Sequence, residues 1–440
     1  MKQKWFASLV FMLVVFTALT GCSQGESAST KDDGKVTIKF HHWYNEEAGN
    51  WEEVIAAFEK EHPEINVESE PLVDNLVFDD YIKKLDLLAS SGDQLDVIMF
   101  AGADHNYSKR VKAGLVEPLN SYLENDHVNY QEEYVRDTSI DGQYYGLPGK
   151  LSVYLVLLNK AHLDEAGLPV PTDWTWDEYM EYADKLTKGE GSSKQYGTYF
   201  HTWPHYFHLL KLLSTPENVS ILQQDGTSNV DNPMVKASLE MRYQMEQVDK
   251  TAVPLSDTLS QKMDYRQQLF TGSASMIPVG TWMITEWGEY TPDFEMVWAP
   301  YPKVEKDDPQ IALNLGDVIS VAKNSEHKEE AYTFARWLST EGMIVQGKSL
   351  PSWSKADIGQ VVDTLVDSTS KPEAIDKESL LNVLENNEPI KWSVPPSYTS
   401  EALNVLTDEG DLYLLGEQDI DTTLSNLEEK IQAIVDANKE

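Results

Sequence analysis

The sequence predicts an α/β protein with two domains, and three observations support this prediction. Strand-like and helix-like segments alternate over residues 36–100, a pattern typical of α/β folds with a mostly parallel sheet. Roughly 420 residues remain after an N-terminal leader, which is more than one hydrophobic core usually serves. Aromatic residues make up 10% of the chain, so the acidic composition is not that of a disordered tail.

The first half of the chain supplies the clearest elements. Alternating residues predict a strand over 36–43, and a helix follows in which Trp51, Val54, Ile55 and Phe58 share one face until Pro63 stops it. A second strand is expected at 65–70, a helix at 79–92 and a third strand at 95–100. Strand, helix, strand, helix and strand in this order indicate parallel pairing.

The remaining elements follow in chain order. Residues 141–168 combine a turn, a long apolar extended run and a short helix. Thr175 and Glu178 form a capping box that places Trp176 in the first turn of a helix. Strand-like runs are expected within 267–284 and 294–302, and an amphipathic helix over 325–340. The last helix carries its apolar side chains on one face, which comprises Ile420, Leu424, Leu427, Ile431 and Ile434.

The N-terminus has the pattern of a secretory signal. Lys2 and Lys4 precede an uncharged run that ends at Thr20, and this run is shorter than the ~20 apolar residues of a membrane span. Leu19, Thr20, Gly21 and Cys22 resemble a bacterial lipobox, in which the cysteine thiol receives a diacylglyceryl group and becomes the new N-terminus. The alternative is a buried cysteine behind an uncut signal. We therefore expect a signal peptide at 1–21 and a lipidated flexible tether at 22–34.

Cysteine usage and charge narrow the compartment and the partners. Cys22 is the only cysteine, so the folded part of a protein outside the cytoplasm contains no disulfide. The formal net charge of −38 argues against nucleic acid or anionic lipid surfaces as partners. The chain has no phosphate-binding loop of the G-x-x-x-x-G-K-[ST] type, and we expect no cofactor.

The order of several segments resembles one known family. These segments are EHPEINVE, ASSGDQLDVIMF, KAGLVEPLNSYL, DGQYYGLPG, LLNKAHLDEAGL, PTDWTWDEYMEYADKL, LFTGSASMIPVGTW and HKEEAYTFARWLS. Together they resemble successive signatures of the family 1 extracellular solute-binding proteins, the sugar receptors of bacterial ABC importers. Each signature alone is weak, and their shared order makes the resemblance specific over roughly residues 35–345.

The resemblance implies a two-lobed periplasmic-binding-protein-like fold of type II, with the ligand cleft between the lobes. It places the first lobe at 35–148 and 302–350 and the second at 149–301 and 351–440. It also implies a lipid-anchored receptor on the outer face of the cytoplasmic membrane. Such a receptor binds a carbohydrate, here expected to be an oligosaccharide, and delivers it to the transmembrane subunits of the permease.

Candidate ligand contacts in the first lobe lie just after strands, where ligands of open α/β sheets bind. Sugars need flat aromatic rings for their C–H faces and polar side chains for their hydroxyls. Trp43, Tyr44 and Asn45 follow the first strand, and Asp104 and His105 follow the strand at 95–100. The alternatives are a core pair at the first position and a helix cap at the second.

Further candidates come from the resemblance. Gly280-Thr281-Trp282 resembles a glycine–tryptophan element at the family's cleft, and Gly316-Asp317 resembles another cleft turn. Tyr154, Trp203 and Trp353 are candidates by position. By contrast, Trp51 and Trp337 lie on or beside apolar helical stripes and are expected in the core, and Asp96 is expected to be structural.

Two other kinds of protein stay open on the sequence. A secreted glycoside hydrolase needs a pair of carboxylates, and a chain with 73 acidic residues always offers one. A metal-binding receptor is suggested by His201, His205 and His208, although a proline interrupts their spacing and no cysteine assists. Peptides and sugar phosphates also remain possible ligands, but few arginines flank the candidate loops.

Overall fold

The structure is a computed structural model, and it describes residues 34–74, 76–101, 105–216, 220–389 and 394–439. Residues 36–440 form one compact unit, to which the description below is confined. Cys22, the signal peptide at 1–21 and nearly all of the tether at 22–34 lie outside the described residues. Of the helices in the described ranges, none combines the length and apolarity needed to cross a membrane.

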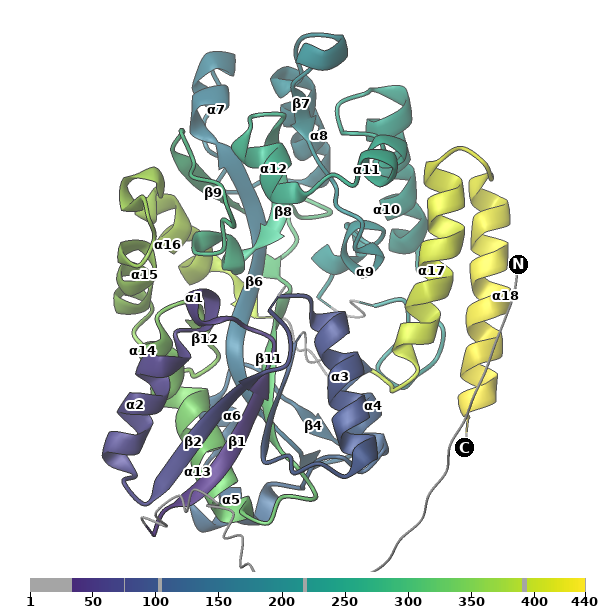
Figure 1. Cartoon of the computed structure of the whole chain (residues 1–440). Coiled ribbons are helices and arrows are strands. Elements are labelled where there is room, and N and C mark those ends of the chain that lie inside the picture. The colour runs from purple at the N-terminus through teal and green to yellow at the C-terminus, as the bar shows by residue number, and fades with distance from the viewer. Residues whose placement is uncertain (1–33, 75, 102–104, 217–219, 390–393, 440) are drawn as a thin grey trace, which may run out of the picture. The chain divides into compact units, whose positions relative to one another are not determined.

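One mixed sheet runs through this unit, in the strand order β2-β1-β3-β11-β6-β8-β7, with β9 and β12 also paired to β6. The long strand β6 lies at its centre (Figure 1). The strands are β1 (Val36–His42), β2 (Ile65–Pro71), β3 (Val97–Phe100), β6 (Leu147–Asn159), β7 (Tyr196–Thr198), β8 (Ala274–Gly280), β9 (Met296–Pro300), β11 (Asn314–Val321) and β12 (Leu350–Pro351). Two short pairs lie apart from it, namely β4 (Ser139–Ile140) with β5 (Gln143–Tyr144) and β10 (Ile311–Ala312) with β13 (Glu388–Pro389).

The prediction of a mostly parallel sheet is wrong for the unit as a whole. Strand β1 pairs in parallel with both β2 and β3, as predicted, and β7 pairs in parallel with β8. Strands β8, β9, β11 and β12 all run antiparallel to β6, and β11 is also antiparallel to β3. One physical reason is that β6 and β11 cross between the two cores in opposite directions, which makes these two strands antiparallel to each other.

Helices surround the sheet. Those next to the first strands are α1 (Glu46–Gly49), α2 (Trp51–Glu61), α3 (Phe78–Ser91), α4 (His105–Lys112), α5 (Asn120–Asn125) and α6 (Tyr130–Glu133). The middle of the chain forms α7 (Lys160–Ala166), α8 (Trp176–Leu186), α9 (Pro204–Phe207), α10 (Pro233–Tyr243), α11 (Leu255–Gln261) and α12 (Tyr265–Phe270). The last are α13 (Lys328–Trp337), α14 (Met343–Gln346), α15 (Ile358–Asp367), α16 (Lys377–Asn386), α17 (Thr399–Leu414) and α18 (Ile420–Asn438).

Short 3₁₀ and π segments complete the list. The 3₁₀ segments are η1 (Gly191–Ser193), η2 (Leu212–Ser214), η4 (Thr281–Ile284) and η6 (Pro372–Ala374), and the π segments are η3 (Gln244–Val248) and η5 (Leu338–Gly342). The capping box of α8 is confirmed, with Thr175 and Glu178 each bonding the other's backbone N–H. In α18 the buried face differs from the prediction, because Val435 rather than Ile434 continues the spacing of Leu427 and Ile431.

Two large hydrophobic cores divide the unit. The first contains side chains of β1, β3 and α13, and the expected core residues Trp51 and Trp337 are buried in it. The second contains the apolar end of β6 together with β8, β9, α8 and side chains from the C-terminal helices. Asp96 is structural as predicted, because its carboxylate accepts from the Lys39 N–H and the Ser325 hydroxyl.

The chain passes between the two cores three times. In β6, Leu147 belongs to the first core and Val153 to the second, and in β11 Leu315 belongs to the second and Val318 to the first. The third passage follows α14, where Leu350 packs in the second core. The predicted lobe boundaries at 148, 301 and 350 stay predictions, because a lobe is defined by the residues that move together as one body.

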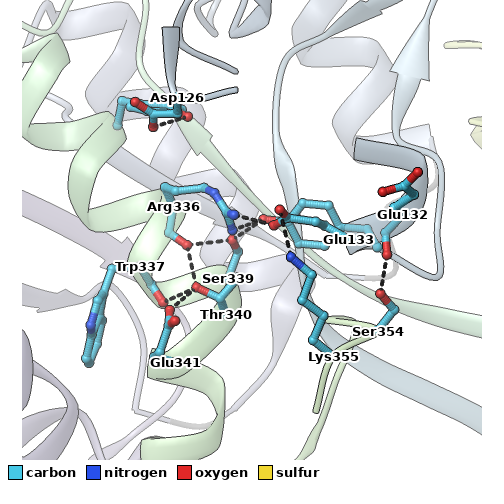
Figure 2. A network of polar contacts seen from close by, with 12 residues as sticks. Asp126, Glu132, Glu133, Arg336, Trp337, Ser339, Thr340, Glu341, Ser354 and Lys355 are labelled. Carbon is cyan, nitrogen blue, oxygen red and sulfur yellow. Dashed lines mark hydrogen bonds and ion pairs between the residues drawn. The ribbon is translucent and has the colours of Figure 1, made fainter. Parts of the chain in front are cut away.

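Polar contacts fix the third passage (Figure 2). The Glu133 carboxylate at the end of α6 pairs with Arg336 of α13 and, at 3.1 Å, with Lys355. The Ser354 N–H donates to the Glu133 carbonyl at 2.9 Å, and the Val135 N–H donates to the Ser352 carbonyl at 3.0 Å. The returning segment is therefore held along the end of α6 before it enters α15.

Candidate functional site

A small pocket lies where the passages between the cores meet. Its lining includes Tyr44 just after β1, Lys150 on β6 and Asp317 on β11, together with Glu286 from the loop after η4. Ala48, Met99, Met343, Gln346, Lys348 and Ser349 complete the lining. The empty volume, about 210 Å³, includes space open to solvent and is still below the ~300 Å³ typical of the smallest ligand sites. The pocket is therefore too small for a whole oligosaccharide.

The polar side chains of this pocket are hydrogen-bonded to one another. The Lys150 ammonium donates to the Glu286 carboxylate at 2.8 Å and to the Tyr44 hydroxyl at 3.4 Å. The Tyr44 hydroxyl in turn donates to the Asp317 carboxylate at 3.3 Å. The guanidinium of Arg266 in α12 also donates to Glu286. It lies 2.7 Å from the backbone carbonyl oxygen of Glu286 and 3.5 Å from the Glu286 carboxylate. These bonds hold hydroxyl and charged groups from five separate segments together at the pocket.

Burial alters the titration of these groups. Desolvation raises the pKa of Asp317 to about 6, although the Lys150 charge and the Tyr44 hydrogen bond oppose the shift. Desolvation, helped by the Asp317 charge, also raises the pKa of Tyr44 well above its usual value. The pKa of Lys150 is raised because Glu286, Tyr44 and Asp317 outweigh the desolvation that would lower it. Lys150 is therefore a cation and Tyr44 a neutral hydroxyl at physiological pH.

Gly316 lets the two crossing strands approach closely. A Cβ atom at this position would lie 1.7 Å from the Lys150 carbonyl oxygen and 3.1 Å from a guanidinium nitrogen of Arg136. The pairing of β11 with β6 shifts register between Gly316 and Val318, and Asp317 lies in that irregularity. The lack of a side chain at 316 therefore brings the Asp317 backbone against β6 next to Lys150.

A cluster of aromatic rings lies in the second core. Trp282 of η4 is 5.5 Å from Tyr154 of β6 and 6.1 Å from Trp203, measured between ring centroids. Tyr206 lies 4.9 Å from Tyr154, and Tyr265 lies 5.4 Å from Trp203. Trp203 and Tyr206 are only partly buried, so their rings keep exposed area. The cluster thus offers flat apolar surface at the edge of this core.

The aromatic cluster and the polar pocket share supporting elements. Lys150 and Tyr154 are four residues apart on β6, and side chains at that spacing point to the same face of a strand. The Glu286 N–H donates to the Trp282 carbonyl at 2.9 Å, and the Arg266 guanidinium lies 4.5 Å from the Tyr265 ring centroid. The polar groups and the rings are therefore supported by the same strand and joined by direct contacts.

Comparison with known sequences decides the family. The profile of the bacterial extracellular solute-binding protein family matches residues 44–344, more than half of the 440-residue chain. The chain belongs to this family. The resemblance found in the sequence is confirmed, and so is the expectation of a binding protein rather than an enzyme, because the relatives are solute-binding receptors.

Related proteins agree with this assignment. The arabinooligosaccharide-binding protein of Bacillus subtilis is 22% identical over 345 residues, 76% of each chain. Among solved structures, a substrate-binding protein of Listeria monocytogenes in complex with cycloalternan has a TM-score of 0.72 at 21% identity, covering 91% of this chain and 98% of that chain. A sugar transporter of Rhizobium etli in an open conformation also gives 0.72, at 22% identity, covering 90% and 99%. These likenesses confirm the two-lobed fold.

The structure of this solute-binding protein brings some predicted site residues together. Tyr44 and Asp317 line the polar pocket, with Gly316 beside them, and Tyr154, Trp203 and Trp282 form most of the aromatic cluster. Their roles in ligand binding stay predictions.

Other predicted residues are outside the pocket lining and the aromatic cluster, although the Trp43 ring lies 4.6 Å from that of Tyr44, or are not described. Trp43 is 5% exposed and packs on Tyr81 in the first core, and the Asn45 side chain caps α1 by accepting from the Ala48 N–H at 3.0 Å. Trp353 pairs through its backbone with Tyr134, beside the end of α6. Asp104 lies outside the described residues, and of His105 only its place at the start of α4 is described.

Sequence reasoning missed several residues of the site. Lys150 could have been identified from the sequence, because it is the only charged residue in the apolar run of β6. Nothing in the local sequence marks the other residues, because their partners are distant in the chain; they are Glu286, Arg266, Tyr206 and Tyr265. Lys150 and Glu286, for example, are 136 residues apart.

A metal site finds no support in the described part of the chain, where no group of three His, Cys, Asp or Glu side chains is arranged to hold an ion. His201 instead bonds the Tyr199 hydroxyl at 3.0 Å, and His208 bonds Asp411 at 2.8 Å.

Proposed function

We propose that this solute-binding protein captures an oligosaccharide outside the cytoplasm and delivers it to an ABC importer. The observation that carries the proposal is the aromatic cluster of Tyr154, Trp203, Tyr206, Tyr265 and Trp282 beside a polar pocket on the same strand. Aromatic faces bind the C–H surface of a sugar ring, and hydrogen-bonding groups satisfy its hydroxyls. Relatives named for arabinooligosaccharides and galactooligosaccharides, and a similar structure with mannotriose bound, support this class of ligand.

The proposed mechanism is closure of two lobes on the ligand. The site takes residues from β6 and β11, which cross between the cores, and from loops on either side of them. A ligand that touches both sides favours the closed form by its differential affinity for that form. The closed form then presents a surface that the permease subunits bind.

We further propose that the protein is tethered to the outer face of the cytoplasmic membrane by lipid on Cys22. The lipobox-like sequence and the polar segment 23–34 support this proposal. One acyl chain gives only marginal membrane binding, so a diacylglyceryl group, with two chains, is suited to stable anchoring.

A thermal-shift screen with oligosaccharides tests the proposal. Ligand that binds the native state raises the unfolding midpoint by mass action. We expect a rise with a few related glycans, and loss of that rise in Trp282→Ala. Tyr122→Ala is a matched control, because Tyr122 is a partly buried aromatic that stacks on Tyr332 against the other core. Equal shifts in both variants would contradict the proposed site, and turnover of a glycan would contradict a purely binding role.

A further inference from the structure

The imidazole ring of His201 lies against the aromatic cluster of the second core. Its centroid is 4.8 Å from that of Trp203, with the two ring planes at 87°, and 5.2 Å from that of Tyr265. Trp203 and Tyr265 are themselves 5.4 Å apart, so the three rings contact one another. His201 is half-buried, as Trp203 is. A polar atom of the imidazole ring is therefore close to any saccharide that contacts Trp203.

The contact between His201 and Tyr199 determines which ring nitrogen carries the hydrogen. Nδ1 of His201 lies 3.0 Å from the Tyr199 hydroxyl oxygen, which is also 3.0 Å from the Met263 carbonyl oxygen. A carbonyl oxygen only accepts, so the single phenolic hydrogen is donated to Met263. The Tyr199 oxygen then accepts from His201, and Nδ1 must carry the hydrogen. In a neutral imidazole the second nitrogen, Nε2, is therefore an acceptor.

The surroundings of His201 keep its ring neutral. Burial lowers the pKa of His201 to about 4. The charge of Asp264 opposes this shift, whereas the charges of Arg242 and Arg266 add to it. The Asp264 carboxylate is engaged in capping α12, where it accepts from the Arg266 and Gln267 N–H groups. At physiological pH, Nε2 of His201 therefore keeps the lone pair with which it accepts a hydrogen bond.

Nε2 of His201 has no hydrogen-bond partner among the residues that the structure describes. His208 differs in this respect, because both of its ring nitrogens have polar neighbours. Its Nε2 bonds the Asp411 carboxylate at 2.8 Å, and its Nδ1 lies 3.4 Å from a guanidinium nitrogen of Arg242. An acceptor on a half-buried ring is stabilised when a hydroxyl group donates to it, and saccharides carry many such groups.

We infer that His201 is a further ligand-binding residue, whose Nε2 accepts a hydrogen bond from a hydroxyl group of the saccharide that stacks on Trp203. The inference rests on the proposed function, because the saccharide must contact the aromatic cluster. Aromatic faces bind the C–H surfaces of many sugars alike, whereas a fixed acceptor requires a hydroxyl group at one place. His201 therefore contributes to the choice among saccharides.

Two substitutions of His201 separate the roles of its two nitrogens. The side-chain amide of asparagine reaches the place of Nδ1, and that of glutamine reaches the place of Nε2. His201→Asn therefore keeps a donor for Tyr199 but loses the acceptor for the ligand, whereas His201→Gln keeps an acceptor for the ligand.

Calorimetric titration with arabinotriose, galactotriose and mannotriose, the classes of sugar named for relatives and a similar structure, measures the affinities. For the trisaccharide that the wild-type protein binds most tightly, we expect His201→Asn to weaken binding about tenfold and His201→Gln to weaken it less. A purely structural role predicts the reverse order, because the bond to Tyr199 would then be the one that matters.

His162→Gln is the matched control, because His162 of α7 is also half-buried and its Nδ1 bonds the Ser275 hydroxyl at 3.0 Å. It should leave the affinity unchanged, and the unfolding midpoint of every variant shows that it is folded. Nitrogen NMR of the imidazole rings gives a second measurement that needs no ligand. With His201→Asn used to assign the signals, it should show the hydrogen of His201 on Nδ1.

Three results would each overturn the inference and leave the proposed function intact. They are unchanged affinity in His201→Asn, a greater loss in His201→Gln than in His201→Asn, and a hydrogen on Nε2 in the free protein. Failure of the folded wild-type protein to bind any of the three trisaccharides would count against the proposed function and, with it, against the inference.

Discussion

Gly280 leaves the space that the indole ring of Trp282 occupies. A Cβ atom at Gly280 would lie 2.0 Å from Cζ3 of that ring, closer than any real contact allows. Gly280 is the last residue of β8 and pairs with Tyr154 of β6. The absence of a side chain at one position therefore sets the orientation of the ring that contacts Tyr154 and Trp203.

The first prediction is that Gly280→Ala weakens saccharide binding by turning the indole ring. We expect a loss of about tenfold in affinity, because the stacking surface moves while the protein stays folded. Titration calorimetry of Gly280→Ala, Trp282→Ala and the double variant measures the coupling. The double variant should bind no more weakly than Trp282→Ala alone, since both changes act through one ring. Additive losses would show that Gly280 acts on something else.

A second prediction concerns Gly316, where β11 meets β6. Gly316→Ala would place a methyl group 1.7 Å from the Lys150 carbonyl, so a backbone segment must shift. The free energy of unfolding should fall by about 3 kcal/mol, as in an overpacked core. Urea denaturation measures this value. Gly359→Ala within α15 is the control, because its nearest neighbour is 3.4 Å away and alanine stabilises a helix. Equal stability of Gly316→Ala and Gly359→Ala would refute the close approach of β11 to β6 at Gly316.

The third prediction follows from the pKa of Asp317, which burial raises from 3.8 to about 6. Between these values the native protein holds a proton that the unfolded chain has released. This contribution to stability is therefore present below pH ~4 and is lost as the pH rises through about 6.

Asp317→Asn removes that titration. Relative to the variant, the wild-type protein should lose up to about 3 kcal/mol of unfolding free energy between pH 4 and pH 7. The difference in unfolding free energy between the two proteins separates the effect of Asp317 from those of His42 and His201. The lowered pKa values of these histidines make stability increase as the pH rises. Tyr44, Lys150, Glu286 and Arg136 are the groups that face Asp317, and they are the same in both proteins. A difference that does not vary with pH would contradict the assigned pKa.

The fourth prediction addresses the membrane tether. Cys22→Ser should release the protein from the membrane fraction of expressing cells, because serine has no thiol to accept the diacylglyceryl group. Fractionation followed by mass spectrometry of the N-terminal peptide measures both location and modification. The ligand affinity of the folded unit should not change. A Cys22→Ser protein that stays in the membrane fraction would refute lipid anchoring at this residue.

Local sequence patterns predicted elements of both cores. The period of α2, the alternation in β1 and the capping box of α8 each depend on residues close in the chain, and each is confirmed. The direction of β6 relative to its neighbours could not be predicted, because an apolar sequence does not indicate whether a strand pairs in parallel or antiparallel. The mixed sheet was therefore missed.

The site was predicted only in part for a similar reason. Tyr154, Trp203 and Trp282 are flat aromatic residues in suggestive positions, and the structure brings their rings together. Trp43 has the same chemistry, yet Phe78 and Tyr81 surround it, and nothing in the local sequence reveals those contacts. The charges around Lys150 come from separate segments, so their balance emerges only in the folded protein.

A crystal structure of the protein with the glycan that raises its unfolding midpoint most tests the central claim directly. We predict a sugar ring stacked on Trp282 or Trp203, with a polar substituent directed at Lys150 and Asp317. A ligand bound elsewhere, or bound without any aromatic face against it, would contradict the account.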